Sequence, residues 1–318
     1  MKSYVMGIDF GSTTAKTVIL NLKGEIVASC VTHMGAISGE GVKASVDGAL
    51  QEARLSQNDI GRTVSTGYGR RMLDIADKNY TEITCHARGA VAMIPEARLI
   101  IDIGGQDSKT IAVDEKGLVI QFAMNDRCAA GTGKFLEVLA RAMSIDLDLM
   151  GETALDARHE LKISSMCATF AETEVISLLA EGETKPDVLG AVHAAIATRT
   201  AGLVARVGQQ GPVVMTGGVA RNRAAVQYIE KALGMPIILP PTPQIAGALG
   251  AALIGLDDYL AECRRQDASI EDDEPLDRQM TLSQASCVPG CKGTQAALAA
   301  ALEPRPVGDL WQRIHAHL

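Results

Sequence analysis

Aromatic residues are scarce in this chain. They make up only 3% of its 318 residues, although 47% of the residues are hydrophobic. The core must therefore be built from Ala, Val, Ile, Leu and Met side chains. A surplus of basic residues is also missing, because the formal net charge is −8. Nucleic-acid binding depends on a basic face that neutralises phosphates, so the composition excludes a nucleic-acid partner.

Long apolar runs are absent as well. The first apolar stretch, residues 4–8, is short and ends in Asp9. A membrane-spanning helix needs about 20 predominantly apolar residues, and a secretory signal has its own longer apolar region. We therefore expect a cytoplasmic protein without a membrane partner.

Several familiar signatures are missing too. No glycine spacing of a P-loop or of a dinucleotide-binding turn follows the first strand, and no nucleophile-elbow sequence surrounds a serine. No Cys-x-x-Cys pair occurs, which excludes a zinc-ribbon or thioredoxin-type site. Seven cysteines are nevertheless present, and without a secretory signal they favour metal or redox chemistry over disulfides.

Most of these cysteines have an ordinary interpretation. Cys30, Cys85 and Cys263 lie in apolar or mixed runs and are expected to be small buried hydrophobes. Cys287 and Cys291 are interpreted either as part of a metal or redox site or as incidental thiols of a tail.

One pattern occurs twice in the chain. Residues 4–20 and 99–113 each read as a strand that ends in an aspartate, a polar glycine-containing turn, a lysine and a second strand. The aspartates are Asp9 and Asp102, and the lysines are Lys16 and Lys109. An internal repeat of this kind predicts two facing hairpin turns that share one ligand. Paired carboxylates with turn N–H groups are typical of a Mg²⁺–phosphate site, although each aspartate alone could be a turn cap.

Two cysteines stand just before predicted helices, namely Cys128 and Cys167, 39 residues apart. Free N–H groups and the helix dipole favour a thiolate there, which could act as a nucleophile or a metal ligand. A structural role for both thiols is the alternative.

The rest of the chain alternates strands and helices, so the fold class is α/β. A strand at 211–216 runs into a Gly-Gly turn at Gly217 and Gly218, followed by helices at 223–233 and 245–260. We divide the chain into an N-terminal half, 1–124, a C-terminal half, 125–260, and a charged linker with a C-terminal extension, 261–318. The doublets Arg70-Arg71 and Arg264-Arg265 are interpreted as solvated surface.

The motifs DFGSTTAK, DIGGQDSK, NDRCAAGTGKF, SSMCATFAETEV and VMTGGVARN, in this order, resemble the BadF/BadG/BcrA/BcrD ATPase family. The resemblance covers roughly residues 3–256, and within the family it is strongest to activators of 2-hydroxyacyl-CoA dehydratases. It implies the fold of the actin, sugar-kinase and heat-shock ATPase superfamily, in which two ribonuclease-H-like halves close over ATP.

The resemblance also implies residue roles. The residues implied to bind the nucleotide are Gly11, Ser12, Thr13, Thr14, Ala15, Lys16, Gly104, Gly105, Gln106, Thr132, Gly217, Gly218 and Gln244. Asp9 and Asp102 would lie near Mg²⁺, and the catalytic candidates are Asp9, Gln106 and Asp107, with Gln106 or Asp107 positioning the attacking water. Cys128 and Cys167 of each chain would hold one [4Fe–4S] cluster at the interface of a homodimer, since four thiolates need two chains.

The function implied is an ATP-dependent one-electron donor. Reduced ferredoxin or flavodoxin would supply the electron, and a 2-hydroxyacyl-CoA dehydratase would receive it. The partner could instead be a benzoyl-CoA-type aromatic ring reductase or another iron–sulfur reductase. Two alternatives come from other classes: a small-molecule kinase, and a cluster-free regulatory ATPase. The extension beyond residue 260, with Cys287 and Cys291, has no counterpart in short activators.

Overall fold

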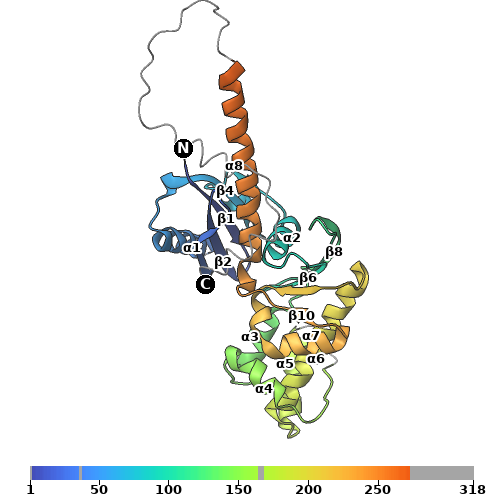
Figure 1. The fold of residues 1–318 in the computed structure, drawn as a ribbon. Helices are drawn as coiled ribbons and strands as arrows, with labels where there is room; N and C mark the ends of the chain where they lie inside the picture. The colour runs from blue at the N-terminus through green and yellow to red at the C-terminus, as the bar shows by residue number, and fades with distance from the viewer. Residues whose placement is uncertain (1, 36–37, 164–167, 273–318) are drawn as a thin grey trace, which may run out of the picture.

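A computed structural model describes residues 2–35, 38–163 and 168–272. Its framework is a pair of five-stranded mixed sheets (Figure 1). The first sheet has the strand order β3 (Ile26–His33), β2 (Thr14–Asn21), β1 (Tyr4–Phe10), β4 (Ile60–Thr66), β5 (Lys78–Asn79). The second has the order β10 (Ile237–Ile238), β9 (Val213–Thr216), β6 (Leu99–Ile103), β7 (Ser108–Val113), β8 (Val119–Asn125). We call each sheet with the helices packed on it the first half and the second half.

The predicted repeat is confirmed in the strand pairing. In both halves a central strand pairs antiparallel with the next strand of its hairpin and parallel with a later strand. Asp9 lies opposite Lys16 in the first hairpin, and Asp102 lies opposite Lys109 in the second. The aspartate and the lysine are equally spaced in the two repeats because the two hairpins have the same strand register.

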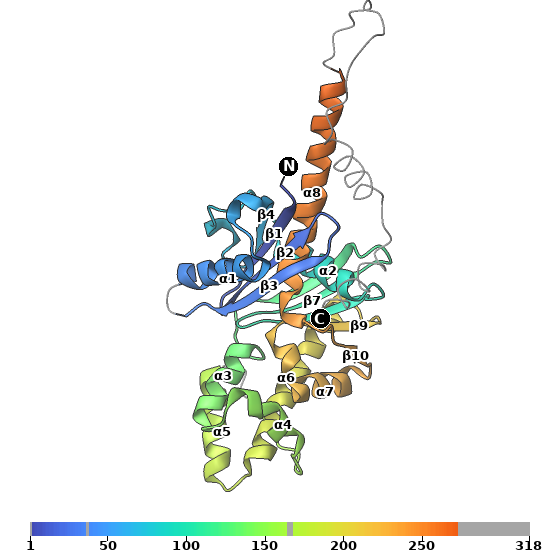
Figure 2. The ribbon, with the colours of Figure 1, turned by 60° about the vertical axis from the view of Figure 1, so that its left-hand side comes forward.

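Helices α2 (Glu82–Met93) and α8 (Ala246–Asp272) join the two halves. Helix α8 packs on β1, β2 and β4 of the first sheet, whereas α2 packs on β6, β7 and β8 of the second, and the two helices contact each other along their length. Figures 1 and 2 show α8 running past the first sheet and extending beyond it. On the outer side of the first sheet lies α1 (Ser38–Ala53).

The second half carries the remaining helices. They are α3 (Gly133–Ala142), α4 (Met150–Leu155), α5 (Ala168–Ala180), α6 (Lys185–Val207) and α7 (Arg223–Leu233). Their apolar faces and the inner face of the second sheet form one buried cluster. Among the described residues, Phe135 is the only fully buried aromatic side chain in this cluster. The core of this half thus consists mainly of Val, Ile, Leu, Met and Ala, as the composition predicts.

Helix α6 has the length and the mean hydropathy, 1.4, of a membrane-spanning helix. It packs against α4 and α7 and buries residues such as Val188, Val192 and Ile196 in the core of the second half. Burial of this kind is the pattern of a core helix.

Two boundaries expected from the sequence are wrong. Strands β6 to β8 lie in the second sheet, so a division at residue 124 cuts through that sheet. The chain also returns to the first half with α8, because a helix from the end of the fold covers the first sheet. Residues 261–272 belong to α8 and are not a linker. Residues 273–318, which include Cys287 and Cys291, lie outside the described residues.

Glycines allow α2 and α8 to approach closely. A Cβ on Gly89 of α2 would collide with the carbonyl oxygen of Ala246, and one on Gly250 of α8 would collide with that of Cys85. Neither neighbour can yield, since both atoms belong to helix backbone. The junction of the two halves therefore depends on these small residues.

We predict that Gly89→Ala lowers the free energy of unfolding by about 1–3 kcal/mol through overpacking, even though alanine is the better helix former. Gly202→Ala in α6 is the matched control, because a Cβ added at Gly202 would have no neighbour within 4 Å. It should be neutral or stabilising by up to about 1 kcal/mol. Urea unfolding of both variants measures the difference, and equal stabilities would contradict the close-packed junction.

Candidate nucleotide-binding site

A cavity of about 1020 Å³ lies between the two halves. Nearly all the site residues predicted from the sequence line it, and they are Asp9, Gly11, Ser12, Thr13, Thr14, Lys16, Asp102, Gly104, Gly105, Gln106, Asp107, Gly217, Gly218 and Gln244. Two predicted residues do not line it. Ala15 is buried in β2, and Thr132 is buried with its hydroxyl donating to Ala129 O at 2.6 Å.

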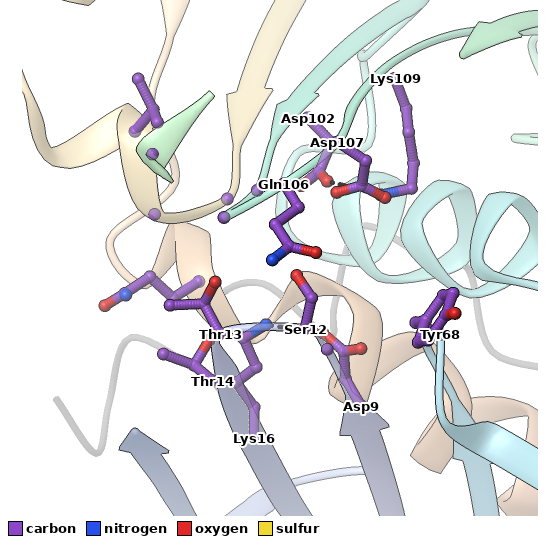
Figure 3. Close-up of a pocket in the computed structure, with 18 of the residues that line it drawn as sticks. Asp9, Ser12, Thr13, Thr14, Lys16, Tyr68, Asp102, Gln106, Asp107 and Lys109 are labelled. Atoms are coloured by element: carbon purple, nitrogen blue, oxygen red, sulfur yellow. Dashed lines mark hydrogen bonds and ion pairs between the residues drawn. The ribbon is translucent and has the colours of Figure 1, made fainter. Parts of the chain in front are cut away.

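The two hairpin turns meet at this cavity (Figure 3). The first turn, residues 11–13, joins β1 to β2, and the second, residues 104–107, joins β6 to β7. They lie so close that a Cβ on Gly105 would collide with the Thr13 side chain. Figure 3 shows Ser12 and Thr13 from one turn facing Gln106 from the other. Turn N–H groups and hydroxyls converging in this way are suited to bind phosphate.

The second turn is also fixed to helix α3. Gly133 N donates to Gly104 O at 2.9 Å, and Lys134 N donates to Gly105 O at 2.7 Å. These N–H groups belong to the first turn of α3, where no partner exists within the helix. The start of α3 therefore follows the position of the phosphate-facing turn.

Asp9 and Asp102 have different surroundings. Asp9 is buried and accepts a hydrogen bond from Lys16 Nζ at 3.0 Å. Asp102 accepts a hydrogen bond from Thr216 Oγ1 at 2.8 Å, and Lys109 Nζ lies 3.4 Å from its second oxygen. His86 Nδ1 is 3.2 Å from Asp102 Oδ1, in an ion-pair contact that lacks hydrogen-bond geometry.

These contacts shift the proton affinities of the buried groups. Burial alone would raise the pKa of Asp102, but His86 and Lys109 hold it far below the ordinary range. Burial would lower the pKa of His86, yet the Asp102 carboxylate raises it above the ordinary histidine value. Both shifts favour the charged form of the pair, which joins α2 to β6.

Lys109 connects three carboxylates. Its Nζ lies 2.6 Å from Asp107 Oδ2, 3.1 Å from Glu82 Oε2 and 3.4 Å from Asp102 Oδ2. Burial acts to lower the pKa of Lys109, but the surrounding carboxylates raise it above the usual lysine value. The lysine thus stays charged and holds β7, α2 and the second turn together at the floor of the cavity.

A Gly-Gly turn forms the other end of the cavity. Gly217 has a φ of +88°, and a Cβ there would collide with Ile103 O, so only glycine fits. Gly217 N donates to Pro243 O at 3.0 Å, which brings the turn beside Gln244. Asn222 begins α7 and accepts a hydrogen bond from Ala225 N at 3.0 Å.

Other residues that line the cavity are hard to recognise from the sequence. They include Leu147, Gly151, Glu152, Arg221, Asn222 and Arg223 from the second half, and Tyr68, Arg70, Arg71, Glu82 and His86 from the segment after β4 and from α2. Glu82 and His86 stand four residues apart and so share one face of α2. That spacing is common in helices, and it indicates a site only once α2 is known to face the cavity.

Cys128 is exposed and lies in the segment 126–132 that joins β8 to α3. Asn125 Nδ2 donates to its carbonyl oxygen at 3.0 Å. The expectation of a thiol directly before a helix is therefore only partly right, because α3 begins at Gly133, after a turn at 129–132. Cys85 and Cys263 are buried, as predicted, and Cys30 is half-buried.

Cys167 lies outside the described residues; α5 begins at the next residue, Ala168. Within the ranges that the structure covers, no group of three or more His, Cys, Asp and Glu side chains could hold a metal ion. Near Cys128 the side chain of Arg199 is half-buried, and burial lowers its pKa.

Two hairpins with equal register, a shared cavity and a Gly-Gly turn define an α/β protein of the actin, sugar-kinase and heat-shock ATPase fold. Two distant structures show this fold alone: EutJ from Carboxydothermus hydrogenoformans, with a TM-score of 0.53 and 18% identity, and a ROK family glucokinase from Streptomyces griseus, with a TM-score of 0.50 and 11% identity. Over residues 6–255 the chain belongs to the BadF/BadG/BcrA/BcrD ATPase family.

Three relatives illustrate the membership. An activator of lactoyl-CoA dehydratase from Anaerotignum propionicum is 48% identical over 250 residues, which are 79% of this chain and 96% of the relative. A 2-hydroxyisocaproyl-CoA dehydratase activator from Clostridioides difficile is 44% identical over 255 residues, 80% and 96% of the two chains. A benzoyl-CoA reductase subunit from Thauera aromatica is 34% identical over 259 residues, 78% and 92%.

Two solved structures are also similar. Component A of the Acidaminococcus fermentans (R)-2-hydroxyglutaryl-CoA dehydratase has a TM-score of 0.78 and 42% identity, and the match covers 81% of this chain and 99% of that one. The activator of the 2-hydroxyisocaproyl-CoA dehydratase from Clostridium difficile, with bound ADPNP, has a TM-score of 0.78 and 43% identity, covering 83% and 97%. The family and the fold together identify this chain as an ATP-binding protein.

Asp102→Asn should lower the free energy of unfolding at pH 6 by about 3–5 kcal/mol, because it leaves His86 buried without its carboxylate and removes one of the three carboxylates around Lys109. The part due to His86 is fully present below the ordinary histidine pKa of about 6.5 and is lost as the pH rises through the raised pKa. Urea unfolding between pH 6 and 9 measures this.

The control for that experiment is Asp257→Asn, which removes an exposed ion pair with Arg88. It should cost less than about 1 kcal/mol. If both variants lost the same free energy of unfolding at every pH, the buried contact between Asp102 and His86 would contribute no more to stability than an exposed ion pair.

Proposed function

We propose that this protein is an ATP-dependent one-electron donor that activates a 2-hydroxyacyl-CoA dehydratase. The observation that carries the proposal is the hydrogen-bonded link from the second phosphate-facing turn through α3 to the Cys128 segment. It supplies a physical route by which nucleotide could act on a redox centre. The relatives named as dehydratase activators support the same partner class.

The nucleotide would lie along the cavity. The turns at 11–14 and 104–106 with Lys16 would take the phosphates, and Gly217, Gly218 and Gln244 would take the adenosine. Mg²⁺ suits Asp9 better than Asp102, because Asp9 has one close cation, Lys16, whereas Asp102 is engaged by Thr216, His86 and Lys109. Asp102 would then act indirectly, by positioning Lys109 and His86.

Gln106 is the better candidate to position the attacking water. Asp107 is bound to Lys109 at 2.6 Å, whereas Gln106 is exposed and its amide faces the cavity between Ser12 and Asp102 in Figure 3. A neutral amide can accept a hydrogen bond from water and donate one to phosphate, which suits the loose transition state of phosphoryl transfer. Thr132 would act indirectly, through the turn before α3.

An iron–sulfur cluster fits the donor set that the chain offers. Cys128 is exposed, Arg199 lies near it, and Cys167 supplies a second thiol, so two chains provide the four thiolates of a [4Fe–4S] cluster. When bound, such a cluster would accept and release one electron at low potential. The proposal therefore includes a homodimer.

The coupling would come from the chain's own residues. If ATP and ADP hold the turn at 104–107 differently, Gly104 and Gly105 carry the difference to Gly133 and Lys134 through two backbone hydrogen bonds. The start of α3 then moves, and with it the short segment that bears Cys128. ATP can drive this change only if it favours one arrangement over the other.

The remaining parts of the proposal concern its surroundings. Reduced ferredoxin or flavodoxin would supply the electron, and the protein would work in the cytoplasm. Similarity to the Thauera aromatica benzoyl-CoA reductase chain makes an aromatic ring reductase the second candidate partner. A small-molecule kinase or a cluster-free regulatory ATPase would give Cys128 and Cys167 no chemical task.

Anaerobically purified protein should contain about four iron and four acid-labile sulfide per dimer. Cys128→Ala should lose both, while Cys30→Ala, which changes a half-buried thiol on β3, should keep them. Iron and sulfide analysis with size measurement checks this. Protein that stays iron-free after reconstitution but still hydrolyses ATP would contradict the electron-donor proposal and favour a cluster-free regulatory ATPase.

Gln106→Leu should slow ATP hydrolysis by about 100-fold or more, because it removes the group that would orient the water, and should leave the dissociation constant for ADP nearly unchanged. Gln51→Leu, on the exposed face of α1, is the control. Steady-state phosphate release and calorimetry distinguish the two effects. A hydrolysis rate equal to that of the wild type would show that another residue positions the attacking water.

A further inference from the structure

The segment from Gly67 to Met72 forms one rim of the cavity. It follows β4 and includes a short 3₁₀ helix, Arg70–Met72. Figure 3 shows Tyr68 beyond Asp9, on the side away from Thr13 and Thr14. The rim therefore lies beyond Asp9, and if Asp9 holds Mg²⁺ as proposed, the terminal phosphate of ATP would point toward it.

This rim is fixed to the first phosphate-facing turn. Gly67 has a φ of +91°, and Gly69 N donates to Phe10 O at 3.0 Å, one residue before the turn. A Cβ on Gly69 would collide with the Phe10 ring. Because the backbone is held at both glycines, Arg70 has a defined starting point beside the cavity.

The lysines near this end of the cavity are already compensated. Lys16 contacts Asp9 at 3.0 Å, and Lys109 contacts Asp107 and Glu82 at 2.6 and 3.1 Å. They cannot supply much further positive charge to a phosphate. An additional cation would be favourable here, because the polyphosphate of ATP carries one more negative charge than that of ADP, and the γ-phosphate that ADP lacks extends beyond the β-phosphate.

Arg70 is held more loosely. Its Nη1 donates to Gly67 O at 3.0 Å and lies 3.8 Å from Glu82 Oε1, beyond hydrogen-bond distance. The side chain is 26% exposed and lines the cavity. Glu82 has a closer cation in Lys109, so it would not be left unpaired if Arg70 turned away.

We propose that Arg70 binds the terminal phosphate of ATP and stabilises the charge that develops on it during hydrolysis. The inference rests on the proposed use of ATP. In this step the oxygen of water bonds to the γ-phosphorus, the bond from phosphorus to the β–γ bridging oxygen breaks, and ADP, phosphate and a proton are formed. Arg70 is not consumed, and its planar N–H groups match two phosphate oxygens.

The assignment replaces the interpretation of Arg70-Arg71 as solvated surface. Both arginines line the cavity, but Arg71 is exposed, whereas Arg70 is half-buried and donates to Gly67 O within the rim. A purely structural role, as a cap on Gly67 O, is the competing account of Arg70. The two accounts differ in whether the loss of Arg70 affects ATP more than ADP.

The test compares Mg²⁺–ADP with Mg²⁺–ADPNP by calorimetry, on the full chain, for wild type and Arg70→Ala. We expect ADP affinity within twofold of wild type and ADPNP affinity weaker by about 10- to 100-fold. The rate of ATP hydrolysis should fall by about 100-fold or more. Equal losses for both nucleotides, or no loss, would overturn the proposal.

Two further variants keep the outcome decisive. Arg70→Lys retains the charge but not the planar fork, so hydrolysis should still fall sharply; a wild-type rate would overturn the proposal even if Arg70→Ala did not fold. Arg88→Ala, in an exposed pair with Asp257, should match wild type in all three measurements. A wild type that neither binds nor hydrolyses ATP would instead refute the proposed function.

Discussion

The contacts of Lys109 hold together the elements of the second half that form the floor of the cavity. One buried ammonium group lies within 3.4 Å of carboxylates from α2, from the end of β6 and from the second phosphate-facing turn. A buried charge without these partners would cost several kcal/mol, so the elements must meet at this point. Asp102 completes the arrangement by pairing with His86 of α2 and with Thr216 of β9. The floor of the cavity is thereby fixed.

Backbone hydrogen bonds connect the second hairpin turn of the cavity to the start of α3, close to the segment that bears Cys128. The first N–H groups of α3 bind the carbonyl oxygens of Gly104 and Gly105, and Cys128 lies a few residues before that helix. A helix start without internal partners is a natural place for such a link, because its donors must be satisfied elsewhere. On the other side of the cavity, the rim that carries Arg70 is tied to Phe10. Both hairpin turns of the cavity are therefore connected by hydrogen bonds to segments outside it.

Much of this site could be predicted from the sequence, because the repeat of aspartate, polar turn and lysine is local. Register places Asp9 opposite Lys16 and Asp102 opposite Lys109 without any long-range information. Glu82, His86 and Arg70 could not be found in this way, since their role depends on how α2 and the β4 rim pack around the cavity. The division at residue 124 failed for a similar reason: α8 returns to the first sheet through glycine contacts that no local pattern reveals.

In the proposed function, ATP hydrolysis drives electron delivery through a redox centre that needs Cys128. This can be measured by mixing the dithionite-reduced protein anaerobically with a 2-hydroxyacyl-CoA dehydratase that has not yet received its activating electron. The readout is the rate at which the dehydratase dehydrates its substrate. We expect activation with Mg²⁺–ATP, none with ADPNP, and none from Cys128→Ala with either nucleotide. Equal activation without ATP, or by Cys128→Ala, would contradict it.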